Sequence, residues 1–279
     1  MSTSRFDGYV LVSDLDGTLI DREHSVSDEN IAAIHSFIDG GGRFLGATGR
    51  TELNVRPFTA DIPLLSPWIL YNGAAIYDWD THSFLYKAPL DRQLTEAFVR
   101  RVLARVPRIN VQVYPGGPFC QINSAALPDS TAVREGQAFE NKPMEAIEDD
   151  WLKVLFCTDI PEEIDVIEAL FDSDPLSAKA HKTHSGPRYF EVTAPGVNKG
   201  SALARLKALL NPPPSCIVAI GDYINDIEML QEADIPAAPE SALGEVKRHA
   251  RIITSCHTKS AIADLVRQLE SSELACPGS

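Results

Sequence analysis

The sequence predicts an α/β protein in which a parallel sheet is interrupted by a smaller α+β unit. At both ends of the chain, short apolar runs alternate with helical segments, which is typical of parallel strands joined by crossover helices. In the middle, the runs come in hairpin-like pairs, which is typical of an antiparallel sheet. We therefore expect a core made of residues 1–87 and 188–279, with residues 88–187 inserted between its two parts as a cap.

In the core, each expected strand is a short run of apolar residues, and each expected helix has apolar residues at helical spacing. The expected strands are Tyr9–Val12, Phe44–Ala47, Trp68–Tyr71, Cys216–Ile220, Ile235–Ala237 and Arg251–Thr254. The expected helices begin at Ser27 or Asp28, near Lys199, near Asn225 and at Ser260, and the first of them stops at Gly40–Gly42.

The middle of the chain is expected to begin with a hairpin and to continue as alternating strands and helices. The hairpin strands are Ala75–Asp78 and Phe84–Lys87, and the later strands are Val111–Tyr114, Phe119–Ile122, Val154–Cys157, Lys179–Thr183 and Tyr189–Thr193. Two helices are expected over about 94–106 and 162–171, and residues 128–148 are expected to form a polar loop.

The composition is that of a globular protein, with 44% apolar and 23% charged residues and a length that suits two domains. A formal net charge of −14 argues against nucleic acid and anionic membranes as partners. Small anions are not excluded, because one bound cation or one fixed lysine can attract them locally. The sequence leaves the oligomeric state open.

The five cysteines are scattered and form no C-x-x-C motif, so neither a disulfide framework nor a zinc site is expected. Cys157 and Cys216 lie in apolar runs and are interpreted as free core thiols. The first residues lack the apolar stretch of a signal peptide, and no run is long enough to span a membrane. We therefore expect the protein in the cytoplasm.

Four of the expected strands end on polar residues: Asp14, Thr48, Asn72 and Asp222. The carboxyl ends of neighbouring parallel strands meet in one crevice, where ligands bind. Any one of these residues could be a helix cap or a turn residue. The four together, with Lys199 in addition, predict a functional site.

The segment from Asp14 to Thr18 carries the strongest chemical signal. Asp14 and Asp16 follow a buried strand two residues apart, and their carboxylates would repel each other unless a cation lay between them. Gly17 permits a sharp turn whose backbone N–H groups could hold phosphate oxygens. A carboxylate that attacks phosphorus needs both charges neutralised, and Mg²⁺ suits that task.

Asp14-x-Asp16-Gly17-Thr18 resembles the first motif of the haloacid dehalogenase (HAD) superfamily of phosphatases. Thr48-Gly49-Arg50, Lys199 and Gly221-Asp222-x-x-Asn225-Asp226 resemble the second, third and fourth motifs, in the same order. Asn72-Gly73-Ala74 and Gly196-Val197-Asn198-Lys199-Gly200 are similar to segments of the Cof-type subfamily. Members of that subfamily have a Rossmann-like core and an α/β cap inserted between the second and third motifs.

The resemblance implies a role for each matching residue. Asp14 would be the nucleophile that forms an aspartyl-phosphate, Asp16 the general acid and base, and Lys199 the cation that balances the charges of Asp14 and the phosphoryl group. The phosphate would be bound by residues of the second motif and by three asparagines: Thr48, Gly49, Arg50, Asn72, Asn198 and Asn225. Mg²⁺ would be held by the Asp14 and Asp222 side chains and the Asp16 carbonyl, with Asp226 supporting the metal or orienting Lys199. For Asn72, Asn198, Asn225 and Asp226, a purely structural role is equally open.

The sequence thus predicts a Mg²⁺-dependent phosphatase that acts on a small phosphorylated metabolite, such as a sugar phosphate. One alternative is a phosphoryl transferase such as a sugar phosphomutase. Another is a phosphate-binding regulator without turnover, against which Asp16 argues, because a long-lived acyl phosphate needs no acid or base beside it. The cap is expected to be a lid that selects the substrate. Tyr114, Trp151 and Tyr189 could face the substrate there or belong to an aromatic core.

Overall fold

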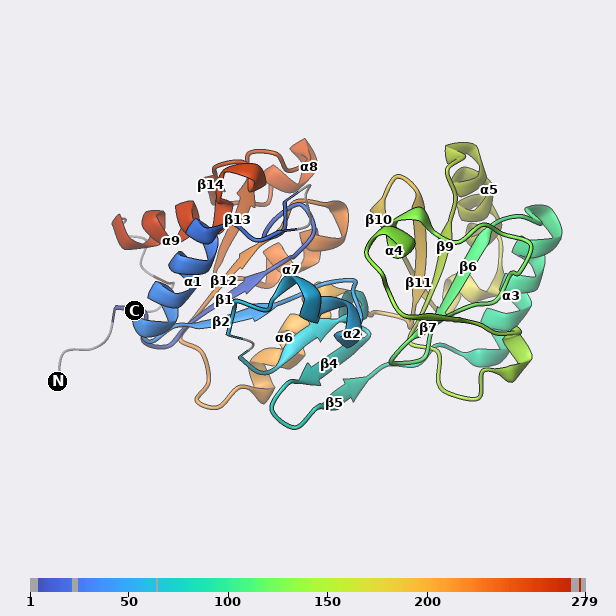
Figure 1. Ribbon diagram of the computed structural model, residues 1–279, viewed down its shortest axis with the longest axis horizontal. Coiled ribbons are helices and arrows are strands. Elements are labelled where there is room, and N and C mark those ends of the chain that lie inside the picture. The colour runs from blue at the N-terminus through green and yellow to red at the C-terminus, as the bar shows by residue number, and fades with distance from the viewer. Residues whose placement is uncertain (1–4, 22–24, 64, 272–275, 277–279) are drawn as a thin grey trace.

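The computed structural model describes residues 5–21, 25–63, 65–271 and 276, and has two lobes (Figure 1). The two ends of the chain form one lobe, and its middle forms the other, drawn in green and yellow. This arrangement confirms the predicted fold class, a parallel α/β core combined with an additional antiparallel sheet. No helix among the described residues is long and apolar enough to cross a membrane.

The core sheet has five strands in the order β14-β13-β12-β1-β2, and every pairing is parallel. The strands are β1 (Tyr9–Ser13), β2 (Arg43–Gly46), β12 (Cys216–Ile220), β13 (Ile235–Pro239) and β14 (Ile252–Thr254). The two central strands, β1 and β12, are buried almost throughout, as expected for strands covered on both faces. Ser13 lies opposite Ile220, so β1 and β12 end side by side.

Helices cover the core sheet. They are α1 (Asp28–Asp39), α2 (Glu52–Val55), α6 (Lys199–Leu209), α7 (Ile227–Glu232), α8 (Gly244–Lys247) and α9 (Ala261–Ser271). Ser27 caps α1, as the sequence suggested, by accepting the N–H of Asn30. Asn198 caps α6 by accepting the N–H of Ser201 at 2.7 Å, and this cap starts the helix at Lys199.

A small antiparallel sheet connects the core to the inserted lobe. It consists of β3 (Trp68–Leu70), β4 (Ala75–Asp78) and β5 (Ser83–Lys87), and contains the expected hairpin. Ile69 of β3 also forms a parallel bridge with Ala47, directly after β2. This bridge places the end of β3 beside the end of β2.

The inserted lobe, which we call the cap, runs from α3 (Arg92–Arg105) to β11 (Tyr189–Thr193). Its strands are ordered β10-β11-β9-β6-β7-β8, with β6 (Asn110–Tyr114), β7 (Phe119–Gln121), β8 (Phe139–Asn141), β9 (Lys153–Cys157) and β10 (His181–Gly186). The cap sheet therefore extends past residue 187, where the sequence placed the boundary, because β11 pairs with β9 and β10. The region expected to be a polar loop contains β8 and α4 (Ser130–Arg134).

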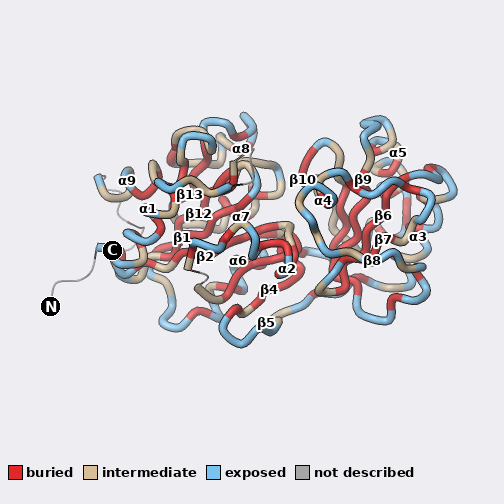
Figure 2. Tube along the Cα trace, viewed as in Figure 1, coloured by how far each residue is buried: buried red, intermediate tan, exposed pale blue. Residues whose placement is uncertain are grey.

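The two faces of the cap sheet differ in chemistry. On one face, Phe156 and Phe190 pack with Phe98 of α3 and Phe171 of α5 (Pro161–Asp172). The other face carries polar side chains, yet its strands β6, β9 and β11 are also buried (Figure 2). Buried polar groups are costly unless they have partners. The partners of this face include residues of the core, as described below.

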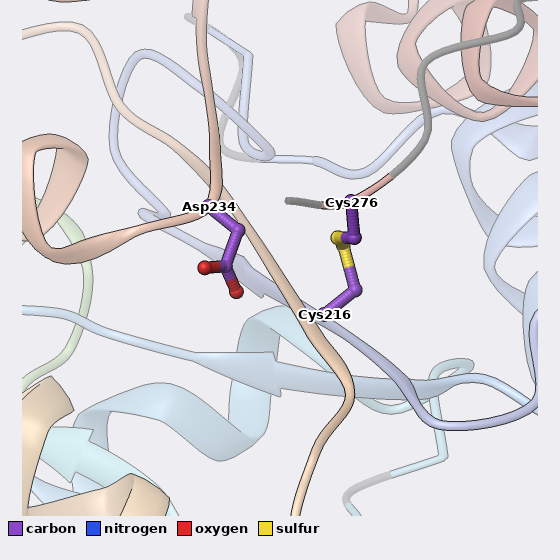
Figure 3. Close-up of side chains that lie close together, drawn as sticks. All are labelled: Cys216, Asp234 and Cys276. Atoms are coloured by element: carbon purple, nitrogen blue, oxygen red, sulfur yellow. A yellow bond between two sulfur atoms is a disulfide. The ribbon is translucent and has the colours of Figure 1, made fainter. Parts of the chain in front are cut away.

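The expectation that Cys216 is a free thiol was wrong, because it forms a disulfide with Cys276 (Figure 3). Cys216 is the first residue of β12, and Cys276 lies 60 positions later, beyond α9. Cys157 is buried and unbonded, as expected for a core thiol. The disulfide joins Cys276 to the first residue of β12, whereas Asp222 follows the other end of that strand.

Candidate active site

The polar residues after β1 and β12 come together because these strands end side by side. The backbone N–H of Asp14 donates to the carbonyl of Ile220 at 2.9 Å, which extends the pairing by one residue. The loops after β2 and β3 are tied in the same way. Thr48 donates its N–H to Ile69 and accepts the N–H of Asn72, both at 3.0 Å. The structure thus supports the predicted convergence of these strand ends.

Lys199 lies between two buried carboxylates. Its Nζ is 2.5 Å from Oδ1 of Asp14 and 2.6 Å from Oδ1 of Asp226, and its side chain is fully buried. Burial lowers the pKa of Lys199, but the two carboxylates outweigh that effect and hold the pKa above its usual value. Burial raises the pKa of Asp14 well above its usual range, while Lys199 opposes this shift. Lys199 therefore fixes the Asp14 carboxylate and offsets part of its charge.

Asp222 faces the turn that follows Asp14. Its Oδ1 accepts a hydrogen bond from the Thr18 hydroxyl at 2.9 Å. Gly17 lies against it with a φ of +83°, and a Cβ atom there would come within 2.5 Å of the Asp222 carboxylate. Glycine is therefore required at position 17 by both the backbone angle and the lack of space.

The carboxylates of Asp14, Asp222 and Asp226 form a cluster that fits a hard divalent cation. One oxygen from each lies within 4.8 Å of the others, and Lys199 offsets only one of the three charges. Both Asp226 oxygens are already engaged, one by Lys199 and the other by the N–H groups of Asp222 and Tyr223. Asp14 and Asp222 would therefore be the better placed ligands, whereas Asp226 holds Lys199 at 2.6 Å.

Arg50 binds the proposed general acid and also reaches the cap. Its guanidinium donates two hydrogen bonds to Asp16, at 2.8 and 2.5 Å, and two to Glu135 after α4, at 2.6 and 3.1 Å. The guanidinium carbon of Arg50 also lies over the aromatic ring of Phe58, 4.3 Å from the ring centre. Forked, charge-assisted hydrogen bonds of this kind fix the orientation of both carboxylates. Arg50 therefore connects Asp16 to the cap.

The three asparagines differ in their surroundings. Asn72 has a left-handed backbone, with a φ of 55°, and its side chain bonds both Glu191 of the cap and Asn225, at 2.8 and 3.1 Å. The Asn198 side chain is used as the cap of α6. These contacts bring Asn72 and Asn225 together beside the loop of Thr48, and they favour a structural role for Asn198.

A model of the haloacid dehalogenase-like hydrolase family matches residues 11–266. The chain belongs to this family. The family expected from the four motifs is thereby confirmed, and with it the prediction of a hydrolase of the phosphatase class.

Three similar proteins are comparable in length to this hydrolase. The 5-amino-6-(5-phospho-D-ribitylamino)uracil phosphatase YcsE of Bacillus subtilis is 29% identical over 270 residues, which cover 96% of this chain and 98% of that protein. A haloacid dehalogenase-like hydrolase from Bacteroides thetaiotaomicron has a similar structure, with a TM-score of 0.80 at 23% identity and coverage of 93% and 98%. A subclass IIB sugar phosphatase of the superfamily gives a TM-score of 0.77 at 20% identity, with coverage of 94% and 98%.

The hydrolase has a cavity of about 250 Å³ between core and cap, with Asp14 and Asp16 in its wall. Tyr114 and Tyr189 line it from the cap, whereas Trp151 belongs to the apolar core of the cap. Four charged cap residues in the wall were not identified from the sequence: Asp129, Glu135, Lys153 and Glu191. Lys153 and Glu191 could have been noticed, because a charged residue inside an apolar strand needs a buried partner.

We expect the metal-free hydrolase to lose stability as the pH rises from about 4 to about 7. Burial and the Asp226 carboxylate raise the pKa of Asp222 from 3.8 to about 7. In this window Asp222 holds a proton in the folded chain that it has lost in the unfolded chain, so its contribution to the free energy of unfolding falls with rising pH. Mg²⁺ should reverse this loss, because it binds the ionised carboxylates of the folded state.

Thermal unfolding at pH 5 and pH 8, with chelator or with Mg²⁺, measures this effect. The rise in Tm caused by Mg²⁺ should be larger at pH 8 than at pH 5. The Asp222→Asn variant is the control, and in it the difference between the two pH values should shrink. An equal Mg²⁺ effect at both pH values would contradict the assignment of Asp222 as a ligand.

Proposed function

We propose that this hydrolase is a Mg²⁺-dependent phosphomonoesterase that releases inorganic phosphate from a small phosphorylated metabolite, with Asp14 as the nucleophile. The observation that carries the proposal is the Asp14 carboxylate, which lies in the cavity wall and is held by Lys199 at 2.5 Å. A buried carboxylate with a fixed cation beside it suits attack on an anionic phosphate ester. The curated relative YcsE, which is named a phosphatase, supports the proposal.

In the first step, a carboxylate oxygen of Asp14 attacks phosphorus and the bond between phosphorus and the ester oxygen breaks. Asp16 gives its proton to the leaving oxygen, and Asp14 is left as an aspartyl-phosphate. Asp16, now ionised, takes a proton from water, which attacks phosphorus and frees both phosphate and Asp14. A bound Mg²⁺, held by Asp14, Asp222 and the Asp16 carbonyl, would neutralise negative charge on the phosphate.

Asp16 must give a proton to the leaving oxygen, yet both of its carboxylate oxygens accept hydrogen bonds from Arg50, at 2.8 and 2.5 Å. Arg50 therefore has to leave Asp16 during the reaction. A phosphate dianion is the competing partner to which the guanidinium would move, which agrees with the predicted role of Arg50 in phosphate binding. Thr48 and Gly49, directly before Arg50, would bind the same phosphate.

The cavity favours a leaving group that is small and rich in hydroxyl groups. About 250 Å³ is slightly below the usual range for small-molecule sites, and the wall offers carboxylates, hydroxyls and amides. Three cap carboxylates lie in the wall, Asp129, Glu135 and Glu191, and their negative charge favours hydroxyl groups over a second phosphate. YcsE acts on a phosphorylated ribityl compound, and one structural neighbour is a sugar phosphatase. We therefore propose a sugar phosphate or polyol phosphate as the substrate.

The cytoplasm is the proposed location, on the grounds given by the sequence. The Cys216–Cys276 disulfide is a feature more common in oxidising compartments. Treating intact cells with an alkylating agent and then counting the free thiols of the protein shows whether Cys216 and Cys276 are reduced or joined in the cell.

Phosphate release from a panel of sugar, polyol and nucleoside monophosphates, with Mg²⁺ or with chelator, tests the proposal. We expect release only with Mg²⁺, and the highest rates with sugar or polyol monophosphates. Transfer of the phosphate to a second hydroxyl without release would indicate a phosphoryl transferase instead. Binding of phosphate without turnover on any substrate, including p-nitrophenyl phosphate, would contradict the proposed hydrolysis.

A further inference from the structure

A buried ion pair lies on the polar face of the cap sheet. Lys153 of β9 and Glu191 of β11 lie on neighbouring strands, and their Nζ and Oε2 atoms are 2.9 Å apart. Their side chains are only 4% and 2% exposed. Burial on this scale is unfavourable for a single charge and acceptable only for a pair with further hydrogen bonds.

Both partners also form a hydrogen bond to the core. Nζ of Lys153 donates to the carbonyl of Gly49 at 2.9 Å. The Glu191 carboxylate accepts the side-chain amide of Asn72 at 2.8 Å. The pair therefore contacts two separate core loops, one after β2 and the other after β3.

These two loops carry the groups proposed to bind phosphate. Gly49 lies between Thr48 and Arg50, so the carbonyl that Lys153 holds belongs to the predicted phosphate-binding segment. Asn72 is joined to the same segment by its backbone N–H, which donates to the Thr48 carbonyl at 3.0 Å. A shift of the pair would thus be transmitted to Thr48 from two sides.

The cap also fixes the ion pair from within. The Ser185 hydroxyl donates to the second oxygen of Glu191. The ring of Tyr114 lies 4.4 Å from Nζ of Lys153, close enough for a cation–π contact. The two charges neutralise each other, and both side chains have further partners on the cap. The cap can therefore pack against the core without burying a single unpaired charge.

We propose that Lys153 and Glu191 are positioning residues that align the Thr48–Arg50 segment and Asn72 for phosphate when the cap meets the core. This inference rests on the proposed phosphatase function. It assigns the cap a part in the chemistry shared by all substrates, in addition to the selection of the leaving group. Contact between cap and core then completes the phosphate site, which couples closure over the substrate to catalysis.

The Lys153→Met variant tests the inference, with Mg²⁺ present throughout. Losing the bond to Gly49 should lower kcat/KM for p-nitrophenyl phosphate by about 10–100-fold, the scale of a misplacement near 1 Å. It should also weaken the binding of inorganic phosphate, measured by calorimetry, by about 10-fold, the worth of one hydrogen bond to a charged group. Lys182→Met is the matched control, because Lys182 pairs with Glu168 and Asp172 within the cap.

A second variant covers the case in which Lys153→Met does not fold. Lys153→Met combined with Glu191→Gln removes both charges together and keeps an oxygen that can accept the Asn72 amide. We expect the Tm of this double variant to lie within a few degrees of the wild-type Tm. Its kcat/KM and phosphate affinity should be lowered as in Lys153→Met.

The outcomes separate the two proposals. A wild-type protein that binds phosphate but hydrolyses nothing would contradict the phosphatase function, while phosphate affinity would still report on the positioning role. An active wild type and a folded variant with unchanged phosphate affinity and unchanged kcat/KM would overturn the positioning role. A lower Tm with both of those quantities unchanged would also overturn it, because it would show a purely structural pair.

Discussion

Replacing Asp14 by Asn is expected to abolish phosphate release. The amide is nearly the same size as the carboxylate but is a far weaker nucleophile, and it cannot form the aspartyl-phosphate. It also removes the negative charge that pairs with Lys199 at 2.5 Å. Asp226 still accepts a hydrogen bond from Lys199 at 2.6 Å, so the buried lysine keeps one carboxylate partner and the core should remain folded.

Release of phosphate from p-nitrophenyl phosphate measures the loss, and thermal unfolding checks the fold of the same sample. Asp165→Asn is a suitable control, because Asp165 is an exposed residue of α5 in the cap and undergoes the same chemical change. We expect full activity in the control and no turnover above the uncatalysed rate in Asp14→Asn. Near wild-type turnover in a folded Asp14→Asn protein would exclude Asp14 as the nucleophile.

The core and the position of its site could be predicted because the signal is local and strong. The run Cys216–Ile220 is apolar throughout, as expected for a strand buried on both faces, and it is followed at once by Gly221 and Asp222. The rule that parallel strands share one carboxyl edge then brings Asp222 close to Asp14. Nothing beyond the order of elements was needed for that step.

The cap was less predictable, because its pairing depends on contacts between residues far apart in the sequence. Strand β8 (Phe139–Asn141) has three residues and is partly exposed at the edge of the sheet, so it has no clear alternation. Tyr189–Thr193 could be identified as a strand, but the sequence does not show which sheet it joins. The boundary at residue 187 was therefore placed before a strand that belongs to the cap sheet.

Pairs of side chains could not be predicted for the same reason. Cysteine spacing alone does not determine connectivity, so the bond between Cys216 and Cys276 could not be inferred. The pairing of Arg50 with Glu135 depends on α4, a helix of five residues that was not expected. Each of these contacts exists only because the fold brings the two segments together.

Replacing Asp16 by Asn is expected to lower kcat for an alkyl phosphate by about 10²–10⁴-fold, the usual worth of a general acid or base. The amide cannot protonate the leaving alkoxide or take a proton from water. With p-nitrophenyl phosphate, whose leaving group needs little protonation, the first step should be much less affected. Hydrolysis of the aspartyl-phosphate should then become limiting, and phosphate should accumulate on Asp14.

Rapid acid quenching with ³²P-labelled substrates measures both steps. Because Asp16 also binds Arg50, the substitution could act by displacing Arg50. Glu135→Gln is the control for that effect, because Glu135 is the other carboxylate that Arg50 binds. That variant weakens the other pairing of Arg50 and leaves the acid in place, so its effect should be smaller and similar for both substrates. If Asp16→Asn slows the two substrates equally and no phosphate is trapped on Asp14, then Asp16 acts through Arg50 and not as the acid and base. A strong dependence on the leaving group, seen only in Asp16→Asn, would instead assign the proton transfer to Asp16.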